Sequence, residues 1–147
     1  MAVDVVSGIA IERPCAAVAG YAADPSNAPE WYANIGSVEW LTDPPVRLGS
    51  RMAFVARFLG RRLAYTYEIV DYAPGERLVM RTAQGPFPME TTYTWRPDGA
   101  GRTQMTLRNR GEPAGFSRLV GPFLAMAMRR ANRKDLAVLK RRLESAT

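Results

Sequence analysis

Hydrophobic and polar residues alternate over short stretches through most of the chain. An apolar residue at every second position predicts a β-strand with one apolar and one polar face. Seven stretches follow this rule, at residues 3–11, 37–41, 52–58, 63–69, 78–82, 89–95 and 103–109. The pattern therefore predicts about seven strands, each half buried.

Turn-forming residues separate these stretches. Pro74-Gly75 is typical of a type II turn, Asp98-Gly99-Ala100-Gly101 of a hairpin loop and Leu59-Gly60 of a tight turn, while Asp43-Pro44-Pro45 ends the second strand. Short connections favour an antiparallel meander whose polar face meets water. The first strand is expected to pair at an edge of this sheet.

Two short helices are expected between the first and second strands. Pro14 stands where a helix can begin, and the Ala-rich residues 15–23 follow it. A second helix is expected over residues 27–34, with Asp24 and Asn27 as candidate caps. Its large side chains, Trp31 and Tyr32, are expected to pack against the sheet.

The residues from 116 to 145 predict one long helix at the end of the chain. Gly121-Pro122 should kink this helix or mark its true start. One apolar stripe runs along it at helical spacing, opposite Arg130, Lys134 and Arg141. The stripe consists of Leu124, Ala125, Met128, Asn132, Leu136, Leu139 and Leu143. It is expected to face the concave side of the sheet, which gives an α+β fold.

Length and composition fit one globular domain over residues 1–147. Hydrophobic residues make up 47% and charged residues 23% of the chain, close to ordinary globular values. No apolar run is long enough to span a bilayer, and Asp4 stands where a secretory signal needs a basic start and an apolar core. We therefore expect a cytoplasmic protein.

The chain has no histidine and one cysteine. The lack of histidine removes the usual general base and every His-containing metal site, so no cofactor or metal is expected. Any catalysis must use carboxylates, Tyr, Arg or Lys. Because Cys15 is the only cysteine, the chain cannot form an intramolecular disulfide. We interpret Cys15 as a small structural residue of the first helix.

The net charge of +6 is carried mainly by arginine. Charged residues occupy the polar faces of the predicted strands, where they are expected to form cross-strand pairs. These residues are Arg51, Arg57, Glu68, Arg77, Arg81, Glu90, Arg96, Arg108 and Arg110. Arginine interleaved with glutamate argues against a nucleic-acid surface, which should be concentrated and of one sign.

Two features of the long helix leave alternatives open. Asn132 interrupts the apolar stripe, and it is either an amide satisfied within the core or a group that orients a ligand. A second apolar strip comprises Phe116, Leu119, Val120, Phe123 and Ala127. This strip is a pocket entrance, a homodimer contact, a membrane-touching edge or, if the helix kinks, part of the core.

Several short motifs together resemble one superfamily over nearly the whole chain. They are Asp24 with Pro29 and Trp31, Val46 with Gly49, Pro74-Gly75-Glu76-Arg77-Leu78, Gly99-Ala100-Gly101-Arg102-Thr103, and Leu136, Leu139-Lys140 and Leu143-Glu144. The chain resembles the START-like, Bet v 1-like helix-grip superfamily (SRPBCC), and within it the bacterial polyketide cyclase/dehydrase and lipid-transport group. Each motif is a marker of the fold, and none is a catalytic signature.

The resemblance implies a ligand cavity between the curved sheet and the long helix. Members of the superfamily bind apolar or amphipathic small molecules there, and a subset cyclises polyketides. The side chains expected to line the cavity are Phe54, Phe58, Tyr65, Tyr67, Met80, Met89, Tyr93, Met105, Leu124, Met128 and Asn132. Several of them are methionines, which suit an adaptable wall; a solid core built from the same residues is the alternative.

Three functions are compatible with this expectation. The first is binding of a small hydrophobic ligand such as a lipid, an isoprenoid or quinone, a steroid or an aromatic polyketide. The second is an aromatase/cyclase-type enzyme that uses the same pocket, with Tyr65, Tyr67 or Tyr93 as hydrogen-bond donors. Glu68 and Glu90 have the opposite parity and are expected to face water. The third is an interaction module for a partner or a membrane surface, without stable insertion.

Overall fold

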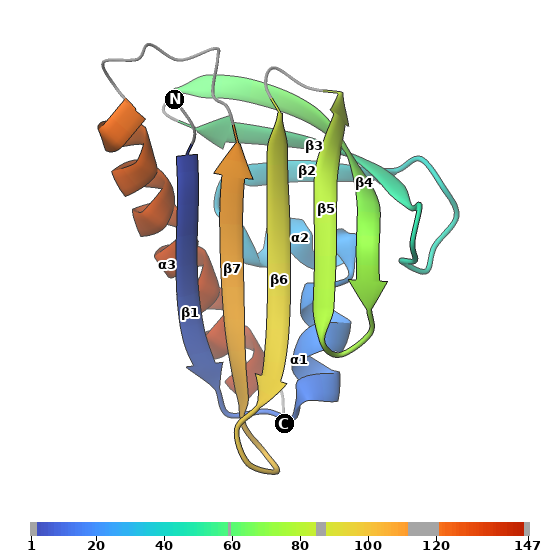
Figure 1. Ribbon diagram of the computed structural model, residues 1–147, viewed down its shortest axis with the longest axis vertical. Coiled ribbons are helices and arrows are strands. Elements are labelled where there is room, and N and C mark those ends of the chain that lie inside the picture. Colours follow the sequence, from blue (N-terminus) through green and yellow to red (C-terminus); the bar gives the residue numbers. More distant parts are fainter. Residues whose placement is uncertain (1–2, 59, 85–87, 112–120, 146–147) are drawn as a thin grey trace.

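The computed structural model describes residues 3–58, 60–84, 88–111 and 121–145, with Phe58 and Gly121 described by their backbone alone. A single antiparallel sheet dominates this part of the chain, and it curves around the long helix α3 (Figure 1). Its strands are β1 (Val3–Ile11), β2 (Ile35–Trp40), β3 (Arg51–Phe58), β4 (Arg61–Ala73), β5 (Arg77–Gln84), β6 (Met89–Pro97) and β7 (Thr103–Gly111).

The strand order is β1-β7-β6-β5-β4-β3-β2, so the six strands from β2 to β7 form a meander and β1 closes the far edge beside β7. This arrangement confirms the predicted α+β fold and the place of the first strand. The turns are those that the sequence predicts, since Gly75 and Gly99 adopt φ values of 80° and 84°. A side chain is strained in that region, and glycine is not.

Two register shifts bend the sheet between β4 and β5. One lies between Ile69 and Asp71, and the other between Thr66 and Tyr67. A bulge increases twist and curvature locally, which wraps the sheet around the helix. The shift at Val70 also reverses parity, so Asp71 faces outward to Arg77 at 2.7 Å, while Glu68 stays on the outer face.

The helices cover the concave side of the sheet (Figure 1). They are α1 (Cys15–Ala22), the 3₁₀ helix η1 (Pro25–Asn27), α2 (Ala28–Trp31) and α3 (Gly121–Ser145). The Asp24 carboxylate caps η1 by accepting from the Ser26 amide at 2.9 Å. The second short helix was expected over residues 27–34, but α2 ends at Trp31. The chain needs the next residues to turn into β2, which begins at Ile35.

The main core lies where α1, α2 and the second half of α3 meet the sheet. Trp31 is 1% exposed and packs among Val18, Leu136 and Leu139 in this core. A smaller cluster joins Leu124 of α3 to Val3 and Val5 of β1. The predicted apolar stripe of α3 thus faces the concave side, and its polar neighbours face outward.

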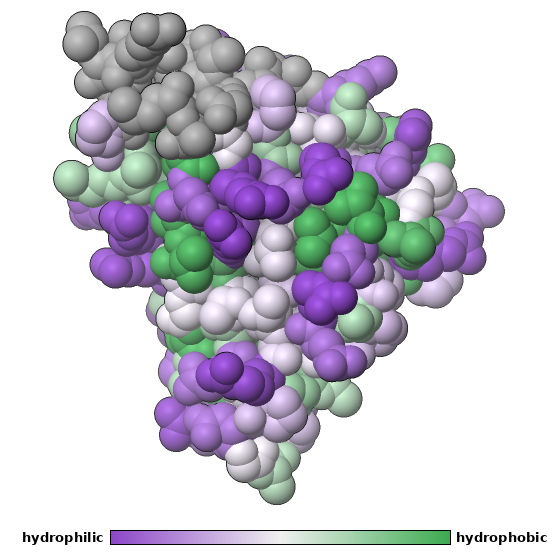
Figure 2. Space-filling model, in the orientation of Figure 1, coloured by the Kyte–Doolittle hydropathy of each residue, from purple (hydrophilic) through white to green (hydrophobic). Residues whose placement is uncertain are grey.

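Hydrophilic residues, coloured purple, form several groups on the face of the molecule shown in Figure 2. On the outer face of the sheet, charged residues of neighbouring strands form a ladder of ion pairs. Asp4 on β1 contacts Arg108 on β7 at 2.5 Å, and Glu90 on β6 contacts Arg81 at 2.6 Å and Arg110 at 2.8 Å. The ladder continues with Arg51 and Glu68, 2.9 Å apart. Cross-strand charge pairs are therefore present at Arg51, Arg81, Arg108 and Arg110.

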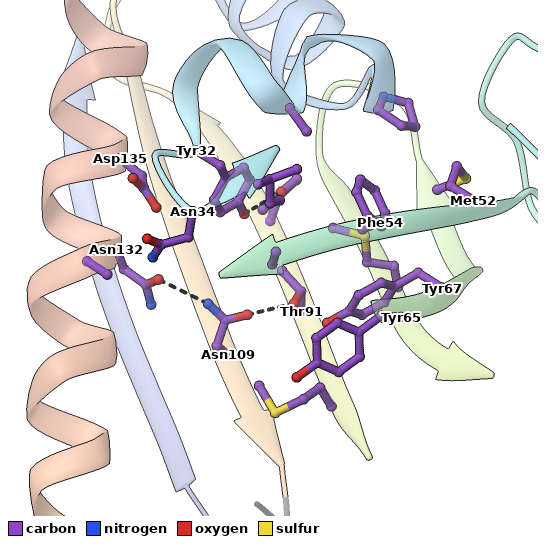
Figure 3. Close-up of a pocket in the computed structure, with 18 of the residues that line it drawn as sticks. Tyr32, Asn34, Met52, Phe54, Tyr65, Tyr67, Thr91, Asn109, Asn132 and Asp135 are labelled. Atoms are coloured by element: carbon purple, nitrogen blue, oxygen red, sulfur yellow. Dashed lines mark hydrogen bonds between the residues drawn. The ribbon is translucent and has the colours of Figure 1, made fainter. Parts of the chain in front are cut away.

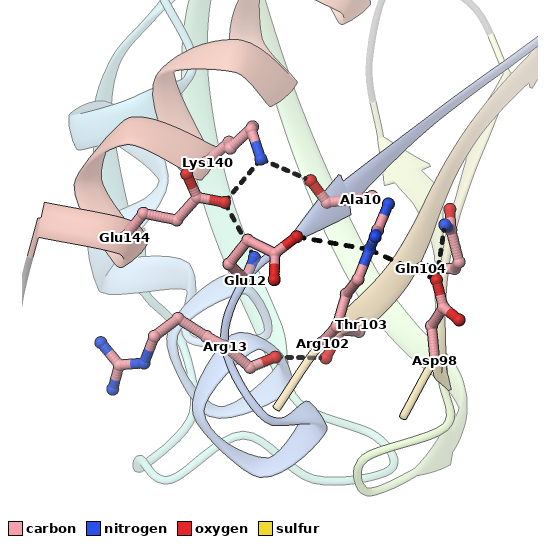
Figure 4. A network of polar contacts seen from close by, with 9 residues as sticks. All are labelled: Ala10, Glu12, Arg13, Asp98, Arg102, Thr103, Gln104, Lys140 and Glu144. Carbon is pink, nitrogen blue, oxygen red and sulfur yellow. Dashed lines mark hydrogen bonds and ion pairs between the residues drawn. The ribbon is translucent and has the colours of Figure 1, made fainter. Parts of the chain in front are cut away.

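A polar network ties the C-terminal end of α3 to the end of β1 (Figure 4). Lys140 Nζ donates to the Ala10 carbonyl at 2.8 Å and lies 2.5 Å from the Glu144 carboxylate. Glu144 in turn accepts from the Glu12 amide at 2.8 Å, and Arg13 donates to the Leu143 carbonyl at 2.8 Å. A cation at the last carbonyls of a helix also interacts favourably with the helix dipole.

Candidate functional site

A cavity lies between the concave face of the sheet and α3 (Figure 3). Its volume is about 160 Å³, and it is partly open to solvent. The sheet, α3 and the η1–α2 segment all contribute side chains to its wall. The cavity therefore occupies the space between sheet and helix where the sequence predicts a binding site.

The wall formed by β3, β4, β5 and β6 is largely apolar. Phe54 and Tyr67 meet edge to face at 5.6 Å, and Tyr65 and Tyr67 lie 5.7 Å apart. Burial raises the pKa of Tyr65 to about 12, and it also raises the pKa of Tyr67. Both phenols stay protonated near neutral pH, so they can act only as neutral hydrogen-bonding groups.

From the edge of this wall, three polar side chains form a hydrogen-bonded row that runs from β6 through β7 to α3 (Figure 3). Thr91 Oγ1 donates to Asn109 Oδ1 at 2.6 Å, and Asn109 Nδ2 donates to Asn132 Oδ1 at 3.2 Å. Asn132 is 5% exposed, and its Nδ2 has no hydrogen-bond partner among the described residues. The sequence left two roles open for Asn132, and only half of its amide is satisfied within the protein.

Asp135 follows Asn132 by one turn of α3 and also lines the cavity. The residue is only 2% exposed, and its Oδ1 accepts from the Ala33 amide at 3.0 Å. Burial raises the pKa of this carboxyl from 3.8 to about 6, against the opposing effect of the Ala33 hydrogen bond. Asp135 can therefore change its protonation state near neutral pH.

Two tyrosine hydroxyls lie near Asp135. Tyr32 Oη and Tyr93 Oη are 2.5 Å apart, and either can donate to the other. Burial raises the pKa of both phenols, and the negative charge of Asp135 raises them further. This part of the cavity wall thus holds the Asp135 carboxyl, the side-chain amides of Asn34 and Asn132, and a pair of neutral tyrosine hydroxyls (Figure 3).

The charged side chains among the described lining residues are all acidic. Among the described residues that line the cavity, Asp24 and Asp135 are acidic and none is Lys or Arg. Asp24 is already engaged as the cap of η1. A ligand in this cavity would meet no cation among the described lining residues, although the whole chain has a net charge of +6.

The structure brings together most of the residues that were expected to line the cavity. Those found in its wall are Phe54, Tyr65, Tyr67, Met80, Met89, Tyr93, Leu124, Met128 and Asn132. Met105 is not among the described lining residues. It is fully buried in the main core and pairs with Ile9 and Trp95. The Phe58 side chain lies outside the described residues.

Sequence reasoning missed the polar part of the wall. Asp135 was overlooked because it stands next to Lys134 and breaks the apolar stripe, although it is three residues from Asn132 and shares its side of the helix. Alternation along the strands alone would place Thr91 and Asn109 on the concave face, since Thr91 is two residues from the inward Tyr93 and Asn109 is two residues from the inward Leu107. A search for polar residues at inward positions would have found all three.

The outer face of α3 differs from the outer face of the sheet. Phe123 and Met126 are 58% and 64% exposed near the start of the helix. Four exposed cations follow them, namely Arg129, Arg130, Arg133 and Lys134. Phe116, Leu119 and Val120 of the predicted apolar strip lie outside the described residues, and Ala127 is half-buried. In the described part of the chain, no helix has the length and apolar character needed to cross a bilayer.

A curved seven-stranded sheet with a long C-terminal helix and a cavity between them defines the START-like helix-grip class. Residues 2–144 match the family described as "Polyketide cyclase / dehydrase and lipid transport". The chain belongs to this family. No curated protein matches the sequence.

Solved structures with the same fold support this assignment. A START superfamily protein from Mycobacterium smegmatis is 16% identical, with a TM-score of 0.85 over 98% of this chain and 99% of that one. The TTHA0849 protein of Thermus thermophilus is 20% identical, with a TM-score of 0.81 over 98% and 99%. The Zhui aromatase/cyclase from Streptomyces sp. R1128 is 17% identical, with a TM-score of 0.81 over 98% and 94%. At these identities the likeness concerns the fold alone.

Proposed function

We propose that the chain forms one ligand-binding domain, and that its cavity binds a small, neutral and largely apolar molecule. The observation that carries this proposal is the composition of the cavity wall, in which aromatic and aliphatic side chains surround a few polar groups. None of the described residues that line the cavity is Lys or Arg. Such a mixture is typical of small-molecule sites. An anionic head group, such as a free carboxylate or a phosphate, would meet acidic side chains and no Lys or Arg among the described lining residues.

The volume supports a compact ligand. A cavity of about 160 Å³ compares with the roughly 150 Å³ of an engineered apolar cavity that accepts benzene. A one-ring compound, or the terminal ring or prenyl unit of a longer molecule, therefore fits inside. A steroid or a multi-ring aromatic polyketide would have to extend through the open side of the cavity.

Native mass spectrometry of freshly purified protein, followed by organic extraction, tests this proposal. A retained neutral compound with an apolar body is the expected result. In parallel, the amide spectrum of ¹⁵N-labelled protein would be recorded with toluene, acetophenone and benzoate at pH 8. Shifts at cavity residues such as Met80 and Met128 are expected with the first two compounds. Equal or stronger binding of benzoate would contradict the proposed ligand class.

A second candidate is an enzyme of the aromatase/cyclase type, and Asp135 is the observation that favours it. A cyclisation of this kind begins when a base removes a proton from carbon next to a carbonyl group. The resulting enolate carbon then attacks a second carbonyl, whose oxygen takes up a proton. A buried carboxyl with a pKa of about 6 suits both proton transfers near neutral pH. The Tyr32–Tyr93 pair lies close enough to Asp135 for the negative charge of this residue to raise the pKa of both phenols.

This candidate is tested without knowledge of the natural substrate. The exchange of the methyl protons of acetophenone in D₂O can be followed by NMR with wild-type protein and with Asp135→Asn. Faster exchange with the wild type, lost in the variant, would support proton transfer by Asp135. Equal exchange with both proteins and with buffer would leave binding as the function.

The outer face of α3 supports a third candidate, contact with an anionic membrane surface. The seven basic and two acidic residues of α3 give it +5 of the net charge of +6. Exposed Phe123 and Met126 add an apolar edge at the same end of the helix as Leu124 and Met128, which line the cavity. Cations beside exposed apolar side chains suit anionic lipid better than nucleic acid.

A further inference from the structure

The unpaired amide nitrogen of Asn132 is an unusual feature of the cavity wall. Asn132 lies midway along α3, with its neighbours on this side of the helix packed against the sheet or lining the cavity. A buried donor with no acceptor is unfavourable, because it has lost its hydrogen bonds to water and gained none in the protein. Such a group is retained in few places in a folded protein, and ligand sites are among them.

In the row of polar side chains, the oxygen of the Asn132 amide is bonded, and its nitrogen has no partner among the described residues. Thr91 donates to the oxygen of Asn109, and the nitrogen of Asn109 donates to the oxygen of Asn132. Asn132 must then offer its oxygen to Asn109, and its two N–H groups remain for another acceptor. Thr91 and Asn109 belong to paired strands and face each other in register, so the sheet holds these two side chains beside each other.

Asp135 limits what that acceptor can be. It lies one turn further along the same helix, about 4.5 Å of axial rise away, and its charge is not balanced by any Lys or Arg of the described cavity lining. Its Oδ1 is held by the Ala33 amide. An anionic oxygen beside Asn132 would therefore be close to a second negative charge, whereas a neutral carbonyl oxygen would not suffer this repulsion.

We infer that Asn132 Nδ2 binds the carbonyl oxygen of a neutral ligand, and that Asp135 makes this site select ketones, aldehydes or quinones over carboxylates. The inference rests on the proposed function, because it requires that the cavity binds a small apolar molecule. The apolar body of the ligand lies against Phe54 and Tyr67 on the sheet, and its carbonyl group points to α3. Asn109 and Thr91 act as positioning residues that hold the Asn132 amide in the required orientation.

A pair of matched probes tests this role. Acetophenone carries the carbonyl oxygen, and α-methylstyrene replaces that oxygen with a methylene group of similar size. Affinities would be measured by NMR titration for the wild type, for Asn132→Leu and for the control Met89→Leu, which alters the wall without removing a donor. Thermal unfolding would establish that each variant is folded.

The wild type is expected to prefer acetophenone about tenfold, the effect of one buried hydrogen bond. Asn132→Leu should lose this preference by weakening acetophenone alone, and Met89→Leu should change both affinities alike. In the wild type, the side-chain amide signal of Asn132 should shift with acetophenone and not with α-methylstyrene. Benzoate should bind at least tenfold more weakly than acetophenone at pH 8.

The outcomes separate the inference from the proposed function. If both neutral probes bind the wild type equally and Asn132→Leu changes neither, the cavity is a binding site but the role of Asn132 is wrong. If Asn132→Leu weakens both probes to the same extent, its effect is one of shape and the role is again wrong. If no probe binds the wild type, the proposed function fails, and the inference fails with it.

Discussion

Replacing Asp135 with asparagine should stabilise the protein, and the gain should grow with pH. Asparagine has the same shape, and its oxygen can still accept from the Ala33 amide that now bonds Asp135 Oδ1. The substitution removes the charge and puts an amide NH₂ group in place of the second carboxyl oxygen, and the effect of that group is the same at every pH. Since burial raises the folded-state pKa of Asp135 from 3.8 to about 6, the folded protein holds this proton more tightly than the unfolded chain does. Wild-type stability must therefore fall as pH rises from about 4 to about 6, and the full loss persists above that range.

The size of the effect follows from the two pKa values. The difference between 3.8 and about 6 corresponds to about 3 kcal/mol at pH 8, at about 1.36 kcal/mol per pH unit. By the same relation the penalty at pH 5 is about 1.6 kcal/mol. The advantage of Asp135→Asn should thus increase by about 1.4 kcal/mol between pH 5 and pH 8.

Urea unfolding of both proteins at pH 5, 6, 7 and 8 measures this difference directly. The wild type and the variant should approach each other at low pH and separate as the pH rises. Asp71→Asn is a suitable control, because Asp71 is an exposed carboxylate paired with Arg77. If the advantage of Asp135→Asn is the same at pH 5 and pH 8, the carboxyl does not titrate in this range. The account of a buried, unpaired acid would then be refuted.

Four further predictions concern the cavity, the core and the two surfaces. Met128→Trp should fill the cavity and abolish binding of acetophenone while the thermal unfolding transition is retained; unfolding of the variant would mean that no space exists there. Leu139→Ala, at a fully buried position, should cost about 2–5 kcal/mol in urea unfolding, and a loss below about 1 kcal/mol would place this side chain outside the core. Arg81→Ser should change stability by less than about 1 kcal/mol, because Arg81 is 58% exposed beside Glu90; a loss of several kcal/mol would mean a buried role. Phe123→Ser should weaken sedimentation with vesicles that contain phosphatidylserine at low salt, and wild-type protein that never sediments with them would exclude the membrane contact.

The strands and turns could be predicted because each is determined locally. Alternation assigns a residue to one face of the sheet, and Pro74-Gly75 or Asp98-Gly99 ends a strand by backbone preference alone. The residues that line the cavity are harder to predict. Alternation tells which face of the sheet a residue lies on, but not whether that part of the face borders the cavity or the closed core. Met105 and Tyr93 both face inward, yet Met105 lies in the closed core and Tyr93 lines the cavity.

The polar wall could not be predicted from hydrophobic patterns. Thr91, Asn109 and Asp135 come from β6, β7 and α3, and their proximity depends on how the helix crosses the sheet. From the sequence, Asp135 would be predicted to lie on the surface, because it stands in a segment rich in arginine. Only the packed structure shows that Asp135 is buried with no Lys or Arg among the described residues of the cavity lining, because burial and pairing depend on contacts between distant segments.

The two ends of α3 are held to the sheet by different kinds of contact. At the C-terminal end, Lys140, Glu144 and the Leu143 carbonyl bond to residues at and just after the end of β1. Among the described residues before Asn132, side-chain contacts of α3 with the sheet are apolar, through Leu124 and Met128. Backbone amides should therefore exchange with deuterium fastest in the first turns of α3 and slowest near Leu139. The turns expected to exchange first include Leu124 and Met128, which line the cavity, so a bound ligand should slow exchange most in the part of the helix that is least protected without it.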